Sequence, residues 1–86
     1  MTRINIIGAG NVAKALGKHL SRNVQIVTVY ARNIIKAELL ATELNSSAVS
    51  DIMDINFDVD FTLIAVSDDA INEVVKEIPP SASIVH

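Results

Sequence analysis

The chain has 86 residues, enough for one small domain. Half of the residues are apolar, which excludes a disordered chain, and the lack of cysteine excludes a disulfide framework and thiolate chemistry. The net charge of −3 conceals an asymmetry, because residues 1–37 hold six bases and no acid, whereas residues 38–86 hold ten acids and one lysine. This asymmetry predicts one anionic ligand bound by the first half; the plainer interpretation is that these bases lie on solvated helix faces.

Membrane, secretory and nucleic-acid classes find little support in the sequence. The apolar stretches are far shorter than the roughly 18 residues that a membrane helix needs. The segment after Arg3 is interrupted by Asn5 and by glycines, unlike a secretory signal. One tyrosine and two phenylalanines provide no aromatic platform for nucleic acid. We therefore expect a cytoplasmic protein with no membrane or nucleic-acid partner.

Apolar segments of strand length alternate along the chain with segments of helical period. The pattern predicts strands at residues 4–7, 24–30, 48–49, 61–66 and 83–85. Helices are expected at residues 12–20, from Asn33 to Asn45, for one turn after Asp51, and from Ser67 or Asp68 to about Lys76. This order predicts an α/β fold, a doubly wound parallel sheet of order 3-2-1-4-5 with helices on both faces.

Two helices carry distinct apolar patterns. In the first, Val12, Leu16 and Leu20 are predicted to form the buried stripe. In the second, buried positions are expected at a spacing of i, i+3, i+4 and i+7, at Ala37, Leu40, Ala41 and Leu44.

All three glycines fall within ten residues, and two of them belong to Gly8-Ala9-Gly10-Asn11-Val12-Ala13, a match to G-x-G-x-x-G/A. Gly8 allows the tight turn from strand to helix, Gly10 lets a pyrophosphate approach the backbone, and Ala13 lets the helix lie close to the sheet. Gly17 provides a second close-packing position. The amides of Asn11, Val12 and Ala13 then face the phosphates at the positive end of the helix dipole. The alternative is a plain strand-turn-helix that binds nothing.

The end of the second strand predicts which dinucleotide binds. NAD-binding domains place an acid there for the ribose 2′-hydroxyl, and this sequence has no acid before Glu38. It offers Arg32 instead, with Lys36 one turn into the helix, and a guanidinium can form a forked contact with a 2′-phosphate. The small Ala31 leaves room, and Asn33 can add a donor. The expected cofactor is therefore NADP(H) rather than NAD(H).

The stretches INIIGAGNVAKALGKHL, VYARN and TLIAVSDDAI resemble the N-terminal Rossmann-like NADP-binding domain of one family. That family is related to the deazaflavin-dependent NADP oxidoreductases, to pyrroline-5-carboxylate reductase and to 6-phosphogluconate dehydrogenase-like proteins. The resemblance covers nearly the whole chain. It implies that Ala65, Val66 and Ser67 run beside the ribose and nicotinamide end of the cofactor. It also implies a second, largely helical domain that forms a homodimer and completes the pocket for a small-molecule substrate.

Residues 1–86 are therefore expected to be the dinucleotide-binding front part of a longer, two-domain protein. The expected function is hydride transfer between nicotinamide and a small carbonyl or imine. A non-catalytic dinucleotide-sensing module is the alternative, and a degenerate domain used only for assembly is a third possibility.

Other acidic residues and histidines are less informative. Asp54, Asn56, Asp58 and Asp60 alternate as in a calcium loop, but the sixth and twelfth positions hold valine and alanine instead of glycine and glutamate. The Asp68-Asp69 pair is interpreted as a helix cap, in preference to a pair of carboxylates for acid–base chemistry. His86 ends a predicted strand, at the edge where ligands bind, but it is also the last residue of the chain.

Overall fold

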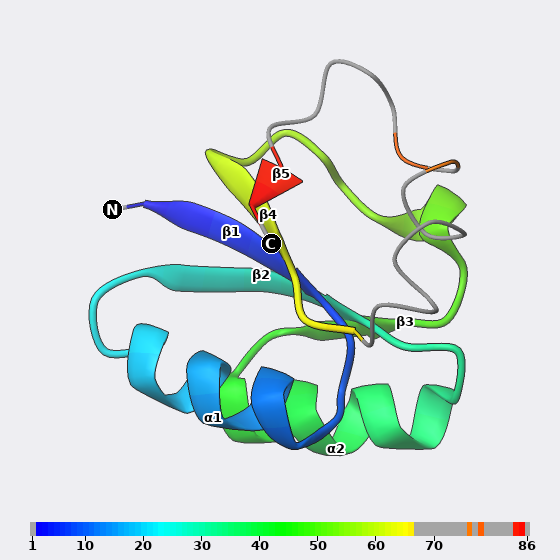
Figure 1. Ribbon diagram of the computed structural model, residues 1–86, viewed down its shortest axis with the longest axis horizontal. Coiled ribbons are helices and arrows are strands. Elements are labelled where there is room, and N and C mark those ends of the chain that lie inside the picture. Colours follow the sequence, from blue (N-terminus) through cyan, green and yellow to red (C-terminus); the bar gives the residue numbers. More distant parts are fainter. Residues whose placement is uncertain (1, 67–75, 77, 79–83, 86) are drawn as a thin grey trace.

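A computed structural model describes residues 2–66, 76, 78, 84 and 85 (Figure 1). The strands are β1 Arg3–Ile7, β2 Gln25–Tyr30, β3 Ser47–Val49, β4 Phe61–Ile64 and β5 Ile84–Val85. The helices are α1 Asn11–Leu20 and α2 Ile34–Leu44, with a single 3-10 turn, η1 Ile52–Asp54. All strand pairs are parallel and the order is β3-β2-β1-β4-β5, which confirms the predicted topology.

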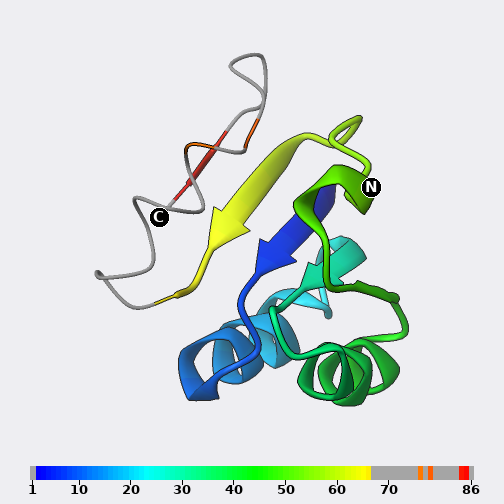
Figure 2. The ribbon, with the colours of Figure 1, turned by 90° about the vertical axis from the view of Figure 1, so that its right-hand side faces the viewer.

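Both α-helices lie on the same face of the sheet (Figure 1, Figure 2). They bury one apolar cluster against it, which includes Ile4, Ile6 and Val29 of the strands. The opposite face carries a second cluster, in which Ile52 and Ile55 of the η1 region pack on the sheet. Helices on both faces were expected, but on this second face the described residues supply only η1. The helix expected from Ser67 or Asp68 lies outside the described residues, Lys76 excepted.

The sequence placed several element ends correctly because short polar side chains cap them. The side chain of Asn33 accepts hydrogen bonds from the amides of Ile35 and Lys36, and so begins α2. Asn45 ends the helix in the left-handed conformation, with φ of 55°, which asparagine tolerates. Asp51 caps η1 by accepting from the amide of Met53. β4 ends at Ile64, two residues before the predicted end.

The apolar stripe predicted for the first helix is wrong at Val12 and Leu16, whereas Leu20 is half-buried against the cluster under the helices. Val12 is 63% exposed and Leu16 is 39% exposed, whereas Ala13 and Gly17 are buried. Gly17 packs closely against both α2 and the sheet: a Cβ built there would lie 2.7 Å from Leu44 Cδ1 of α2 and 3.3 Å from Ile6 Cδ1 of β1. The glycine motif predicted this face correctly, since it gave Ala13 and Gly17 as close-packing positions. The stripe chosen by hydrophobicity overlooked it, because alanine and glycine contribute little to such a ranking.

Strand β2 contains an irregularity that the sequence pattern did not indicate. Its register with β1 shifts between Ile4 and Asn5, which pair with Ile26 and Thr28 respectively. The extra residue reverses the alternation of side chains, since Ile26 and Val29 both reach the cluster under the helices. The bulge thus keeps two large residues on the helical face.

Candidate functional site

The carboxyl ends of three central strands meet at the glycine turn. The Gly8 amide donates to the Tyr30 carbonyl at 2.7 Å, and the Ala65 amide donates to the Ile7 carbonyl at 2.8 Å. These bonds hold the turn between the ends of β2 and β4, at the point where the strand order reverses. Ligands of open α/β sheets bind at this kind of switch point.

The two glycines of the turn differ in what requires them. Gly8 has φ of +122°, and a Cβ there would lie 2.5 Å from the carbonyl oxygen of Ala65, so the fold itself demands glycine. Gly10 has an ordinary extended conformation, with φ of −80°, and a Cβ there would meet nothing within 4 Å. The fold therefore does not explain Gly10, whereas a ligand pressed against the backbone would.

The first turn of α1 has free hydrogen-bonding capacity toward solvent. Gly10 provides no side-chain cap, and the first intrahelical bond runs from the Lys14 amide to the Gly10 carbonyl. The amides of Asn11, Val12 and Ala13 precede that bond, and the first turn contains no acid. This end of the helix has the hydrogen-bond donors and the positive dipole that bind an anion, so it fits a pyrophosphate.

A hollow of about 270 Å³, here called the edge hollow, brings the predicted site residues together. Its lining comes from the glycine turn, from the end of β2 and from the segment after β4: Gly8, Ala9, Gly10, Tyr30, Ala31, Arg32, Asn33, Lys36 and Val66. Ala31 is buried, whereas Arg32, Asn33 and Lys36 are exposed. Among the described residues that line this hollow there is no acid, and the charged ones, Arg32 and Lys36, are both basic.

Not every predicted residue lines this hollow. Asn11 belongs to a neighbouring hollow, and Val12 and Ala13 contribute through their position in the first turn of α1. Ala65 lies against Gly8 through its carbonyl group. Ser67 lies outside the described residues. Asn33 uses its side-chain oxygen as the cap of α2, which leaves its amide group as the donor expected from the sequence.

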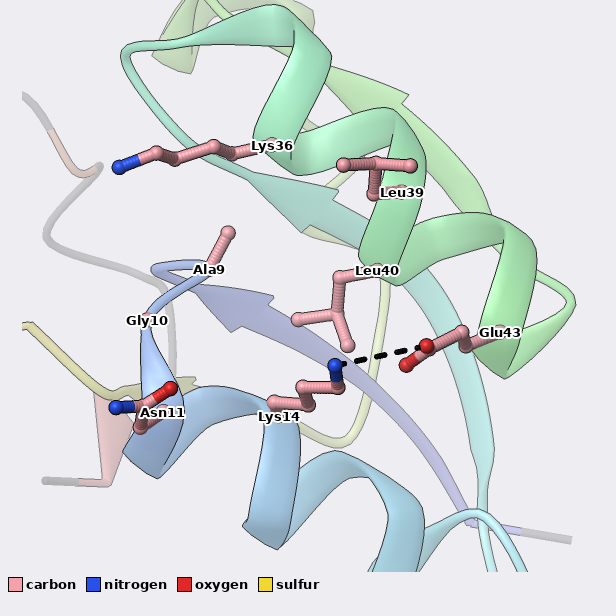
Figure 3. A pocket seen from close by; sticks show the side chains of 8 residues that line it. All are labelled: Ala9, Gly10, Asn11, Lys14, Lys36, Leu39, Leu40 and Glu43. Carbon is pink, nitrogen blue, oxygen red and sulfur yellow. Dashed lines mark ion pairs between the residues drawn. The ribbon is translucent and has the colours of Figure 1, made fainter.

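The sequence analysis missed the neighbouring hollow, a space of about 410 Å³ between α1 and α2 (Figure 3). This interhelical hollow shares three residues with the edge hollow and adds five from the facing helices: Ala9, Gly10 and Lys36, then Asn11, Lys14, Leu39, Leu40 and Glu43. Lys14 is 51% exposed, as the interpretation of solvated bases on helix faces expects, and its Nζ atom also lies 3.7 Å from Glu43 Oε1. The sequence did contain one signal for this contact: Lys14 and Lys18 are four residues apart and so lie on the same face of α1. Both of them pair with Glu43 of α2.

The part of the chain that the structure describes contains neither a metal-binding cluster nor a membrane-spanning helix. There, no group of three or more histidine, cysteine, aspartate or glutamate side chains could hold a metal ion. In that same part, neither helix has the length and apolar character that a membrane crossing requires.

The parallel order, the glycine turn and the uncapped α1 define a dinucleotide-binding domain of the Rossmann type. Residues 3–85 match the family described as NADP oxidoreductase, coenzyme F420-dependent, and the chain belongs to that family. It is thus an oxidoreductase-family domain whose cofactor is NADP. The resemblance noted from the sequence is confirmed.

Solved structures of other proteins are similar to this chain. A protein from Bacteroides fragilis assigned as an NADP oxidoreductase is 33% identical, with a TM-score of 0.83 over 87% of this chain and 30% of that one. One from Desulfitobacterium hafniense assigned as an NADPH-dependent oxidoreductase is 25% identical, with a TM-score of 0.78 over 96% of this chain and 25% of that one. A myo-inositol dehydrogenase from Corynebacterium glutamicum, at 18% identity, a TM-score of 0.79 and coverage of 98% and 27%, shares the fold. No curated protein matches the chain.

Proposed function

We propose that residues 1–86 are the NADP(H)-binding domain of a longer oxidoreductase. In this proposal the pyrophosphate lies on the glycine turn and on the amides of Asn11, Val12 and Ala13. The main support for the proposal is Gly10, because neither its backbone conformation nor the packing around it requires a glycine. The space above it is where a phosphate has to approach the chain.

Preference for NADP over NAD is assigned to the end of β2. Arg32, Lys36 and the amide group of Asn33 are proposed to bind the 2′-phosphate, with the small Ala31 leaving room for the ribose. A guanidinium can hold a phosphate through two parallel hydrogen bonds, which gives direction as well as charge. Ala65, Val66 and Ser67 are proposed to flank the ribose at the nicotinamide end.

The bound cofactor supplies a hydride at the nicotinamide ring, and the chain's own part is to bind and orient it. The proposed acceptor is a small carbonyl or imine compound, and the family description makes coenzyme F420 a second candidate. The chain covers 30% and 25% of the two solved oxidoreductases, which supports the proposal of a further domain. A homodimer and a cytoplasmic location are proposed on the resemblance and on composition.

Calorimetric titration of the purified protein with NADPH and NADH tests the binding proposal. NADPH should bind at least about tenfold more tightly than NADH, a difference of about 1.4 kcal/mol. Arg32→Ala should remove most of that difference. Arg22→Ala is the matched control, since Arg22 is exposed in the turn after α1, and it should change neither affinity. Equal losses of NADPH and NADH affinity in Arg32→Ala would contradict the assignment.

Oxidation of NADPH by the full-length protein distinguishes an enzyme from the sensing module. An enzyme consumes NADPH in the presence of a carbonyl, an imine or coenzyme F420. Tight and selective NADPH binding without turnover of any of these compounds would favour the sensing module.

A further inference from the structure

The edge hollow and the interhelical hollow meet at the glycine turn. Ala9, Gly10 and Lys36 line both of them. Lys36 extends from α2 and Lys14 from α1, and the Ala9 methyl group points into the space between the helices (Figure 3). A phosphate bound beside Lys36 over Ala9 would therefore have Lys14 on the opposite wall of the same hollow.

Lys14 is held only weakly where it is. Its Nζ atom lies 3.7 Å from Glu43 Oε1, and the two side chains are 51% and 40% exposed. Exposed pairs of this kind contribute little to stability, because solvent screens the charges and both side chains lose freedom. A doubly charged phosphate is a stronger partner for an ammonium group than one exposed carboxylate.

Glu43 does not lose its charge compensation when Lys14 leaves. Its other oxygen, Oε2, pairs with Lys18 at 3.7 Å, and Lys18 does not line the hollow. Transfer of Lys14 to a phosphate thus costs one weak ion pair and leaves no isolated carboxylate. Without this second lysine, Glu43 would repel the incoming phosphate from the wall of the hollow.

We infer that Lys14 is a specificity-determining residue, which moves from Glu43 to the 2′-phosphate and adds a third cation to Arg32 and Lys36. The inference rests on the proposed function, since it needs a dinucleotide on the glycine turn. It extends the discrimination between NADP and NAD from the end of β2 to the facing helix. Lys18, one turn further along α1, takes over the neutralisation of Glu43.

Lys14→Met tests the inference, because methionine keeps most of the aliphatic chain and removes the charge. Arg22→Met is the control, since Arg22 is exposed in the turn after α1 and lines neither hollow. Each variant is titrated with adenosine 2′,5′-bisphosphate, 5′-AMP, NADPH and NADH. Lys14→Met should weaken adenosine 2′,5′-bisphosphate and NADPH about tenfold, and 5′-AMP and NADH by less than twofold. Arg22→Met should change all four by less than twofold.

Thermal unfolding separates binding from folding, and both variants should unfold at nearly the same temperature. Similar affinities in Lys14→Met and the wild type, or an equal loss for phosphorylated and unphosphorylated ligands, would overturn the role of Lys14. If Arg32→Ala still removes the NADPH preference in that case, the proposed function stands. A wild type that binds neither NADPH nor adenosine 2′,5′-bisphosphate would overturn both proposals.

Discussion

The two β–α units at the start of the chain share a topology and differ in how each helix begins and packs. Helix α1 begins at Gly10 with no side-chain cap and packs through Ala13 and Gly17. Helix α2 begins at Asn33, whose side chain occupies two of its first amides, and it packs through four residues that include two leucines. The first unit leaves the amides of its first turn without a side-chain cap, whereas the second caps its own first amides.

The largest expected effect comes from the turn that opens the first unit. Gly8→Ala places a Cβ 2.5 Å from the Ala65 carbonyl at a positive φ, so backbone strain and overpacking add. We expect a loss of about 4 kcal/mol in the free energy of unfolding, measured by denaturant titration. Gly10→Ala should cost less than about 1 kcal/mol and should weaken dinucleotide binding instead. Similar stability losses in the two variants would remove the distinction between a structural and a binding glycine.

Leucine truncation compares the packing of the two helices. Leu40 of α2 is 4% exposed, and Leu40→Ala should destabilise the protein by about 3 kcal/mol, within the usual range for a buried leucine. Leu16 of α1 is 39% exposed, and Leu16→Ala should cost less than about 1 kcal/mol. The midpoints of urea unfolding give both values. A large loss of stability for Leu16→Ala would mean that Leu16 is buried after all, as the sequence predicted.

The close packing of α1 is tested at Gly17. Gly17→Ala gains about 1 kcal/mol of helix propensity but presses on Leu44 and Ile6, at 2.7 and 3.3 Å. A net loss of about 1 kcal/mol is expected, because overpacking costs about 1–3 kcal/mol. Leu44→Ala should relieve the contact, so the double-mutant cycle should show favourable coupling between the two changes. Simple additivity would mean that Leu44 does not limit the approach of α1.

The smallest stability effect is expected at the cap of α2. Asn33→Asp keeps a carboxyl oxygen for the amides of Ile35 and Lys36, so the melting temperature should barely change. The new negative charge lies in the edge hollow, and NADPH affinity should fall about tenfold while NADH affinity changes less. Asn33→Ala provides the reverse control, with about 1 kcal/mol lost from stability. Unchanged NADPH affinity in Asn33→Asp would place the 2′-phosphate elsewhere.

Local signals in the sequence predicted the fold well. Strand order followed from the alternation of elements, and Asn33, Asn45 and Asp51 marked boundaries because each forms a capping interaction with nearby backbone. The glycine motif located the candidate site for the same reason: a strand-to-helix turn is a short-range feature.

Tertiary contacts were less predictable. On α1 the glycine motif correctly gave Ala13 and Gly17 as close-packing positions, whereas hydrophobicity alone wrongly assigned Val12 and Leu16 to the buried face. The interhelical hollow depends on Lys14 and Glu43, which are 29 positions apart and on different helices. The bulge in β2 reverses a face that strict alternation would have assigned otherwise.

The charges around the two hollows have a kinetic consequence. The described residues that line them include three bases and one acid, Lys14, Arg32, Lys36 and Glu43, which sum to a charge of +2 on a chain whose net charge is −3. At the other end of β1, the Arg3 amide and guanidinium are bonded to Asp60 and Asp58. A field of this form draws a polyanion toward the glycine turn before contact is made. The association rate for NADPH should therefore fall as ionic strength rises, more steeply than that for NADH.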